Sequence, residues 1–264
     1  MSSLLHVAGR AARTGYQDYK VIYTWKTWLA GWYLRVLAQV AFFALIGELL
    51  GSRERTHFLL VGTAVFLASA GTFVAVASTA WERWSGTLPL LVASPTRPVL
   101  VFSTRSLYFV VDAVLTSLGA FFVAAPLFGL ELPWPRVLLV VPLVGVVALA
   151  SYALAIAVGG IAVRLPSVRN VASNVTTLTM LTVCGVVVPV GFYPAPVQWL
   201  AQALPLTHGL AAVRDLLAGE PLAALLPNVG LEVLVGLAWL GVALLTFDRL
   251  ASSGRRDGSI EFGG

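Results

Sequence analysis

Arg35 and Asp112 are ionisable residues inside long apolar stretches of this sequence, where a charged side chain is costly and usually has a function. Arg35 falls within Trp28–Leu50, and Asp112 falls within Val99–Leu130. Opposite charges in apolar surroundings favour one another, so we expect the two to pair or to share a polar cluster with Gln39. In the alternative interpretation, Arg35 extends its guanidinium to the lipid headgroups along its own aliphatic stem.

Residues for catalysis, metal binding or nucleotide hydrolysis are sparse. The three histidines (His6, His57 and His208) are scattered along the chain, so neither a zinc site nor paired haem ligands are predicted. A P-loop requires the pattern G-x-x-x-x-G-K-[S/T], and the only lysines are Lys20 and Lys26. The sequence therefore predicts no catalytic site, no metal site and no cofactor held by this chain.

The kind of structural element that positions these residues can be inferred from the unusual composition of the chain. Of the 264 residues, 58% are hydrophobic and 11% are charged, whereas a soluble domain has about a quarter charged residues. So much apolar surface cannot be buried within one globule of this length, so the excess must face lipid. The single cysteine lies in an apolar run, which rules out a disulfide framework.

Six stretches reach the roughly 20 apolar residues that a helix needs to cross a bilayer. The sequence thus predicts an all-α, polytopic fold with a membrane domain over residues 28–250, a cytoplasmic N-terminal segment over 1–27 and a disordered cytoplasmic tail over 251–264. The six predicted spans are Trp28–Leu50, Phe58–Ala80, Val99–Leu130, Val137–Val163, Val171–Val190 and Pro227–Phe247.

The cations between these spans sort to one side of the membrane, as the positive-inside rule requires. With a cytoplasmic N-terminus, the cytoplasmic set is Arg10, Arg13, Lys20, Lys26, Arg83, Arg97, Arg105, Arg164, Arg169, Arg249, Arg255 and Arg256. The outer set is Arg53, Arg55, Arg136 and Arg214. Both termini are then cytoplasmic. Because these cations form collars at the membrane edge and not one basic face, nucleic-acid binding is not predicted. The bias toward arginine over lysine favours a bacterial cell membrane.

Two further segments are predicted to lie at the membrane surfaces. Tyr16, Tyr19 and Tyr23 share one helical face, which is typical of a helix along the cytoplasmic interface, of an ordinary aromatic belt, or of both. The apolar segment Gly185–Gly219 is broken by prolines into pieces too short to span. We expect short re-entrant helices in the outer leaflet, with an ordinary outer loop as the alternative.

The loop after the second span carries a charged pair at the membrane edge, Glu82 and Arg83, followed by space for one short helix over Thr87–Ala93. Such a helix could dock a partner protein. The alternative is that the two charges merely solvate the loop.

At this loop the chain resembles the permease subunits of type-two ATP-binding-cassette (ABC) exporters. The residues that match the loop motif are Glu82, Gly86, Thr87, Leu88, Leu90, Leu91, Ser94 and Pro95. A second motif is matched near the fifth span by Gly191, Phe192, Pro194, Trp199, Leu200, Pro205, Leu206, Thr207, Arg214 and Asp215. Pro89 departs from the pattern, because many members have glutamate there.

The resemblance implies an interface helix, a coupling helix in the first cytoplasmic loop and half-membrane helices before the sixth span. It also implies an ATPase subunit that binds ATP and Mg²⁺, and a second permease copy, identical or related. The implied coupling residues are Glu82, Arg83, Gly86, Thr87, Leu88, Leu91 and Pro95. The implied re-entrant segment is marked by Gly191, Phe192, Pro194 and Pro205.

By the same resemblance, the second and fifth spans line a substrate path between two protomers. The candidate path residues are Gln39, Thr72, Asn174, Thr177 and Met180. The alternative is that the small polar residues of these spans only pack helices together. Without a charge in the middle of either span, an amphipathic, lipid-like or drug-like cargo, or a lipid-linked glycan, is favoured over a small ion.

Three functions remain open at this point. The first is a non-enzymatic permease subunit of an ATP-driven exporter, in contact with membrane lipids. The second is a gradient-driven secondary transporter working without an ATPase, although such carriers usually show repeat symmetry and charged groups at mid-membrane. A membrane enzyme or scaffold is the third, and no marked catalytic site supports it.

Overall fold

In a computed structural model, residues 24–76, 103–162 and 169–257 are described, together with residues 9–10, 13 and 15–17. Every regular element over Trp25–Asp257 in these ranges is a helix, which confirms the all-α prediction. Within the described ranges, five helices are long and apolar enough to cross a membrane. They are Trp25–Leu49, Arg53–Val76, Ser103–Leu127, Arg136–Gly160 and Leu222–Thr246.

The first of these helices is assembled from α2 (Trp25–Thr27), a π-helix η1 (Trp28–Tyr33) and α3 (Leu34–Leu49). Thr24 caps its start, because the hydroxyl of Thr24 accepts the Thr27 N–H at 3.3 Å. A tight turn with Gly51 at φ +66° then leads to α4 (Arg53–Thr72), which is capped by Ser52. The structure therefore starts the first span three residues inside the predicted N-terminal segment.

The remaining helices follow in chain order. They are α8 (Tyr108–Leu127), η2 (Arg136–Leu139), α9 (Val140–Ala162), α10 (Arg169–Val183), η4 (Val190–Phe192), α11 (Ala195–Ala203), α12 (Thr207–Leu217) and α13 (Leu222–Asp257).

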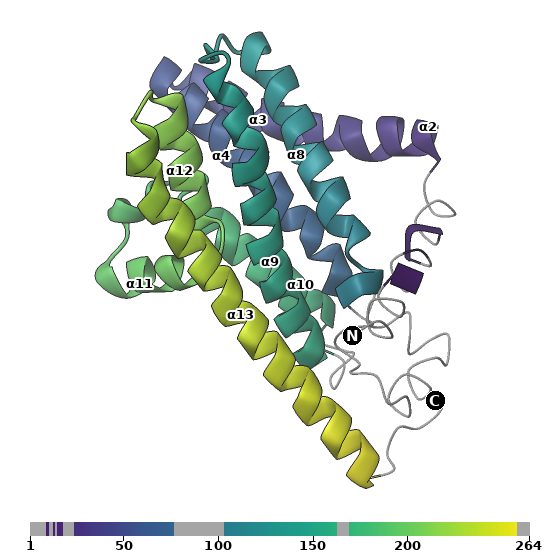
Figure 1. Ribbon diagram of the computed structural model, residues 1–264. Coiled ribbons are helices and arrows are strands. Elements are labelled where there is room, and N and C mark those ends of the chain that lie inside the picture. The colour runs from purple at the N-terminus through teal and green to yellow at the C-terminus, as the bar shows by residue number, and fades with distance from the viewer. Residues whose placement is uncertain are drawn as a thin grey trace.

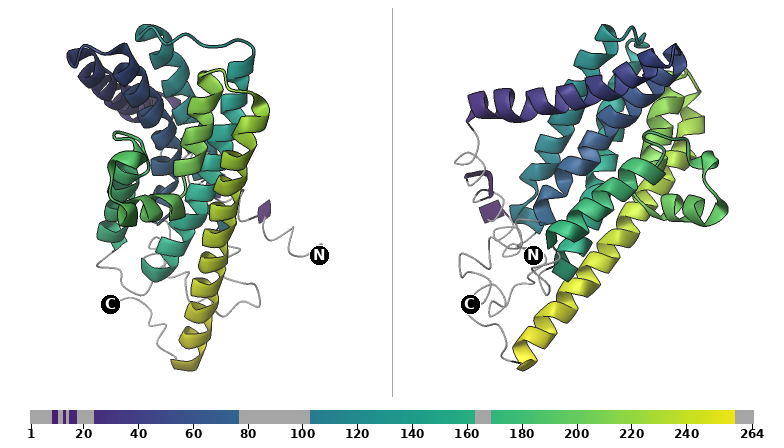
Figure 2. Two further views of the ribbon diagram at one scale, coloured as in Figure 1. Left: turned by 90° about the vertical axis from the view of Figure 1, so that its left-hand side faces the viewer. Right: turned by 180° about the vertical axis from the view of Figure 1, so that it is seen from behind.

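α4 forms the centre of the bundle and contacts α3, α8, α9, α10 and α12. α13 packs along α9, where a Cβ on Gly236 would lie 2.9 Å from the Ala150 Cβ, so the absent side chain lets the two helices cross closely. The first helix lies at a large angle to α4, α8, α9 and α13, which run along the bundle (Figure 1; Figure 2). It is also little buried, since 17% of its apolar window is covered against 89% for that of α4.

The two ends of the bundle differ in which cations they carry. The turn between α3 and α4 and the start of η2 lie at one end, and the starts of α8 and α10 and the end of α13 lie at the other (Figure 1). Arg53 and Arg136 thus begin helices at the first end, and Arg169 begins α10 at the second. The predicted sorting holds for these three. Arg214 differs, because it is half-buried on α12 and does not join an exposed outer collar.

The fifth predicted span and the predicted tail differ from the structure. The fifth span is predicted over Val171–Val190, but the helix α10 ends at Val183. Gly185 follows at φ +82°, the left-handed conformation that commonly follows a helix end. The 15 residues of α10 are fewer than the roughly 20 that a crossing needs, so the six-span layout stays a prediction. α13 continues to Asp257, so the prediction of a disordered tail is wrong for residues 251–257.

Several predicted features lie outside the described residues. They are most of the N-terminal interface segment, the end of the second span beyond Val76 and the whole predicted coupling loop.

Candidate functional site

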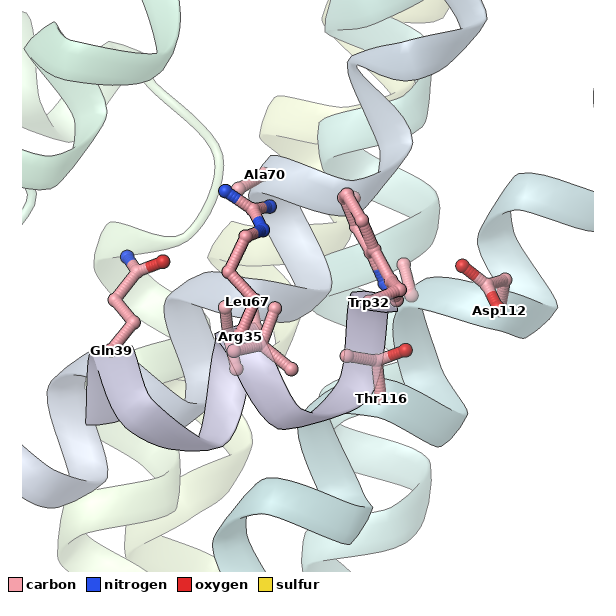
Figure 3. Close-up of a pocket in the computed structure, with 10 residues that line it drawn as sticks. Trp32, Arg35, Gln39, Leu67, Ala70, Asp112 and Thr116 are labelled. Atoms are coloured by element: carbon pink, nitrogen blue, oxygen red, sulfur yellow. The ribbon is translucent and has the colours of Figure 1, made fainter. Parts of the chain in front are cut away.

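A pocket of about 110 Å³ opens where α3, α4 and α8 meet, and we call it the α3–α4–α8 pocket (Figure 3). It holds Arg35, Gln39 and Asp112, the polar residues of the first and third predicted spans that the sequence analysis groups together. Its lining residues are Trp32, Arg35, Val36, Gln39, Leu67, Ala70, Gly71, Asp112, Ala113 and Thr116.

Helical spacing brings these residues to one place. Trp32, Arg35 and Gln39 follow one another at intervals of three and four, so they share one face of the first helix. Asp112 and Thr116 are one turn apart on α8. Trp32 belongs to the π-helix η1, and such wide turns are frequent at functional sites.

The floor of the pocket depends on a close approach of α4 and α8. A Cβ on Gly71 would lie 2.7 Å from the Ala113 Cβ and 3.2 Å from its Cα. One turn further along α8, the hydroxyl of Ser117 donates a hydrogen bond to the carbonyl of Ala64 at 2.8 Å. Small residues and an interhelical hydrogen bond thus hold α4 and α8 together at the floor of the pocket, as is usual in membrane bundles.

The structure brings Arg35, Asp112 and Gln39 into the same pocket. Two of the contacts in this cluster are with tryptophans. The guanidinium of Arg35 lies over the Trp32 ring, 4.6 Å from its centroid, and the Trp28 indole N–H donates to Asp112 Oδ1 at 2.7 Å. The Trp32 side chain lies between the two charges in Figure 3, so the tryptophans take part in the polar cluster that Arg35, Asp112 and Gln39 share in this pocket.

Two polar atoms at this pocket are buried without a hydrogen-bond partner among the described residues. They are the indole Nε1 of Trp32 and the hydroxyl of Thr116. Nearly all buried polar groups in proteins are paired, and each unpaired one costs about 1–3 kcal/mol. Their presence beside a cavity points to a ligand or to water as the missing partner.

The other predicted path residues lie away from this pocket. Thr72 is fully buried and donates to the carbonyl of Ser69 at 2.7 Å, and Met180 is fully buried with its sulfur 3.7 Å from the Ser69 hydroxyl. On α10, Asn174 is exposed and Thr177 is half-buried. Within one chain, Gln39 is therefore the only one of the five that lines the pocket.

The predicted re-entrant segment folds as short helices. Gly191 and Phe192 end η4, Pro194 caps the start of α11, and Pro205 lies between α11 and α12. With nine residues in α11 and 11 in α12, at about 1.5 Å per residue, neither is long enough to cross a bilayer. Their re-entrant placement in the outer leaflet stays a prediction.

A buried carboxylate on the last span holds the start of α12, and the sequence analysis missed it. Glu232 of α13 is fully buried. Its Oε1 accepts the N–H of Leu206 at 2.7 Å, and its Oε2 accepts the N–H of Gly209 at 2.9 Å. A carboxylate at a helix N-terminus is favoured by the helix dipole and satisfies orphan N–H groups.

The backbone around this contact has little freedom. Leu206 has φ +89°, a conformation that non-glycine residues rarely adopt. A Cβ on Gly209 would lie 2.2 Å from the Val147 side chain of α9 and 3.2 Å from the Glu232 carboxyl carbon. One signal in the sequence could have found Glu232, since it is an acidic residue inside a predicted span.

Arg214 ties α12 to two other parts of the bundle. Its Nη1 donates to the carbonyl of Gly185 at 2.8 Å, and its Nη2 donates to the carbonyl of Phe58 at 3.1 Å. The guanidinium also lies over the Phe58 ring, 3.6 Å from the centroid. α12 is thus clamped to α4 and to the turn after α10 by Arg214, and to α13 by Glu232.

These observations define a multi-pass, all-helical membrane protein with a polar pocket inside its helix bundle and a clamped segment before its last span. Its sequence matches the family model of the ABC-2 type transporter over residues 18–218. Because the match spans well over half of the chain, the protein belongs to the ABC-2 type transporter family. It is therefore a transport protein of the permease class. No curated protein matches the chain.

Proposed function

We propose that this chain is the transmembrane permease subunit of an ATP-driven exporter that moves an amphipathic molecule outward. Its cargo is a lipid-like or drug-like molecule or a lipid-linked glycan. The observation that carries the proposal is the ABC-2 family match over residues 18–218. It is supported by the five helices in the described ranges that are apolar enough to span a membrane.

The energy source in this proposal is a separate ATPase subunit with ATP and Mg²⁺. The chain has no P-loop lysine. The loop after the second span receives the ATPase, and its coupling residues are Glu82, Arg83, Gly86, Thr87, Leu88, Leu91 and Pro95.

The working unit in this proposal contains two permeases, identical or related, in a bacterial cell membrane with both termini cytoplasmic. α10 serves as the fifth span, and α4 and α10 border the path between the copies. This arrangement is supported by the exposed face of α10, on which Val171, Val175 and Leu178 are each more than half exposed in the single chain.

The test is copurification from native membranes in mild detergent, followed by reconstitution in vesicles. We expect an ATP-binding subunit to accompany the chain in a fixed ratio. Replacing residues 82–98 by a glycine–serine linker of equal length should release that subunit. The matched control is Glu131→Gln, which removes an exposed acidic residue in the segment between α8 and η2 and should leave the subunit bound.

Transport in the same vesicles distinguishes the exporter from a gradient-driven carrier. An exporter of this kind keeps working when ion gradients are collapsed at constant ATP. A chain that purifies alone and transports in vesicles without ATP would instead be a secondary transporter.

A further inference from the structure

We propose that the α3–α4–α8 pocket binds the phosphate group of a membrane phospholipid whose acyl chains lie along the first helix. The unpaired polar atoms of the pocket, the Arg35 guanidinium and the apolar face that continues beyond it all fit such a ligand. A site of this kind goes beyond the proposed function, because it requires neither the ATPase nor transport.

The first helix presents more hydrogen-bond donors than acceptors to the pocket. Arg35 has five N–H groups and no acceptor, and the Gln39 amide adds two N–H groups and one oxygen. The Arg35 guanidinium lies over the Trp32 ring, a contact with the π face that uses none of these N–H groups as hydrogen-bond donors. The Trp32 indole N–H is itself buried and unpaired among the described residues. Phosphate oxygens are strong acceptors for such a set of donors.

A second helix adds a buried hydroxyl to the same pocket. Thr116 of α8 is 2% exposed, and its hydroxyl has no hydrogen-bond partner in the part of the chain that the structure describes. A hydroxyl can donate to a phosphate oxygen. A phosphate in the pocket thus gives a partner to Trp32 on the first helix and to Thr116 on α8, and it joins the two helices.

Asp112 also lines the pocket, and its carboxylate accepts the Trp28 indole N–H. In Figure 3 the Trp32 side chain lies between Asp112 and Arg35, so the phosphate is placed on the Arg35 side of this ring and no part of the ligand is assigned to Asp112. A phosphodiester carries one negative charge. Arg35, the one cation among the described lining residues, balances it.

The size of the pocket fits a phosphate group and not a whole drug molecule. Its volume is about 110 Å³, well above the roughly 10–15 Å³ that can hold one water molecule. Pockets for drug-sized ligands are larger, at about 300–1,000 Å³. The phosphate can therefore enter while the rest of the lipid stays outside the pocket.

An exposed apolar face continues from the pocket along the same helix. Phe42 lies seven residues after Arg35 and three after Gln39, so the three share one helical face. Phe42 is 60% exposed, and Leu45 and Leu49 on the following turns are 52% and 87% exposed. Acyl chains can lie along these side chains while the phosphate is held at Arg35. A free phosphate ion would make no use of this face, so a lipid is the favoured source of the phosphate.

The test is native mass spectrometry of the full chain in detergent, titrated with phosphatidylglycerol or with diacylglycerol of the same acyl chains. The two lipids differ in the headgroup that carries the phosphate. We expect the wild-type protein to retain phosphatidylglycerol about tenfold more tightly than diacylglycerol, as for an interaction of about 1.4 kcal/mol. Equal retention of the two lipids by the wild-type protein would overturn the proposal.

Substitutions locate the retained lipid. Arg35→Gln should remove most of the preference for phosphatidylglycerol. Trp32→Phe removes the indole N–H but keeps an aromatic ring under Arg35, and Thr116→Val replaces the hydroxyl by a methyl of similar size. We expect each of these two to weaken phosphatidylglycerol retention about three- to tenfold, as for the loss of one hydrogen bond.

The control is Arg53→Gln, at an exposed arginine that begins α4, and it should match the wild type. If Arg53→Gln weakened retention as much as Arg35→Gln, the lipid would be held by general charge attraction, which would overturn the proposal. Unchanged retention in all three pocket variants would mean that the pocket holds only water, and it would overturn the proposal as well.

Competition identifies the source of the phosphate. Inorganic phosphate at millimolar concentration should displace little bound phosphatidylglycerol, because it has no acyl chains to contact the face of Phe42, Leu45 and Leu49. Full displacement would assign the pocket to a free anion and overturn the proposal. Since retention is measured without the ATPase, a failure here leaves the proposed function standing, and an ATPase that does not copurify leaves this site standing.

Discussion

Glu232 on α13 accepts the backbone N–H of Gly209 on α12 at 2.9 Å, although the two residues lie 23 positions apart in the chain. The same carboxylate accepts the N–H of Leu206. The last span therefore holds the N-terminus of the preceding short helix directly. These two hydrogen bonds tie α12 to α13.

Removing the Glu232 carboxylate should destabilise the protein, because two buried N–H groups then lose their acceptor. We expect Glu232→Ala to lower the free energy of unfolding by about 3 kcal/mol, and Glu232→Gln, which keeps one acceptor oxygen, by about half as much. The measurement is equilibrium unfolding in mixed micelles. Glu131→Gln, at an exposed acidic residue, is the control, with an expected change within about 0.5 kcal/mol. Equal loss from Glu232→Gln and Glu131→Gln would contradict the contact.

The membrane helices could be predicted from sequence because hydropathy over about 20 residues is a direct consequence of bilayer thickness. Five of the six predicted spans correspond to helices in the structure. The fifth differs because hydropathy continues from Val183 to Val190, whereas the helix ends near Gly185 at φ +82°. A hydropathy average does not detect a single residue with left-handed backbone geometry.

The candidate site could be predicted only in part. Arg35, Gln39 and Asp112 were grouped from their charges and their depth in the spans, and the structure places them in one pocket. The partners of the two charges, Trp28 and Trp32, depend on how the helices rotate and cross, which one sequence does not specify. Glu232 could have been singled out as an acidic residue inside a predicted span, but its hydrogen-bond partners are backbone N–H groups, which no side-chain motif marks.

A methyl group at Gly71 should separate α4 from α8 at the pocket, because the added Cβ would lie 2.7 Å from that of Ala113. We expect Gly71→Ala to lower the free energy of unfolding by about 1–3 kcal/mol, measured in mixed micelles. The double variant Gly71→Ala/Ala113→Gly should recover part of the loss. Gly145→Ala on α9 is the matched control, since no atom lies within 4 Å of its Cβ position. A double variant whose loss of unfolding free energy exceeds the sum of the two single losses would argue against this contact.

Replacing Arg214 by lysine should loosen α12 even though the charge is kept. The guanidinium reaches the carbonyls of Gly185 and Phe58 together, and a single ammonium cannot reproduce this geometry or the stacking on the Phe58 ring. We expect Arg214→Lys to cost about 2–4 kcal/mol of unfolding free energy, the value of one or two hydrogen bonds to a charged group. Arg55→Lys, at an exposed arginine of α4, should change it by less than about 0.5 kcal/mol. Two equally stable variants would show that the clamp contributes nothing.

If α10 borders a path between two copies of the chain, cysteines on its exposed face should cross-link those copies. Val175 is 56% exposed on α10, and Leu149 is 55% exposed on α9, so the two positions are matched in exposure but lie on different helices. The native Cys184 is buried and is replaced by alanine in both variants, so that any disulfide forms through the introduced cysteine. We expect mild oxidation in native membranes to convert Val175→Cys, and not Leu149→Cys, to a disulfide-linked dimer on a non-reducing gel. Cross-linking of both would indicate random collision in the bilayer. If Val175→Cys forms no disulfide-linked dimer in a protein that still binds its ATPase, the result would contradict self-pairing through α10. It would favour a related second permease at that surface.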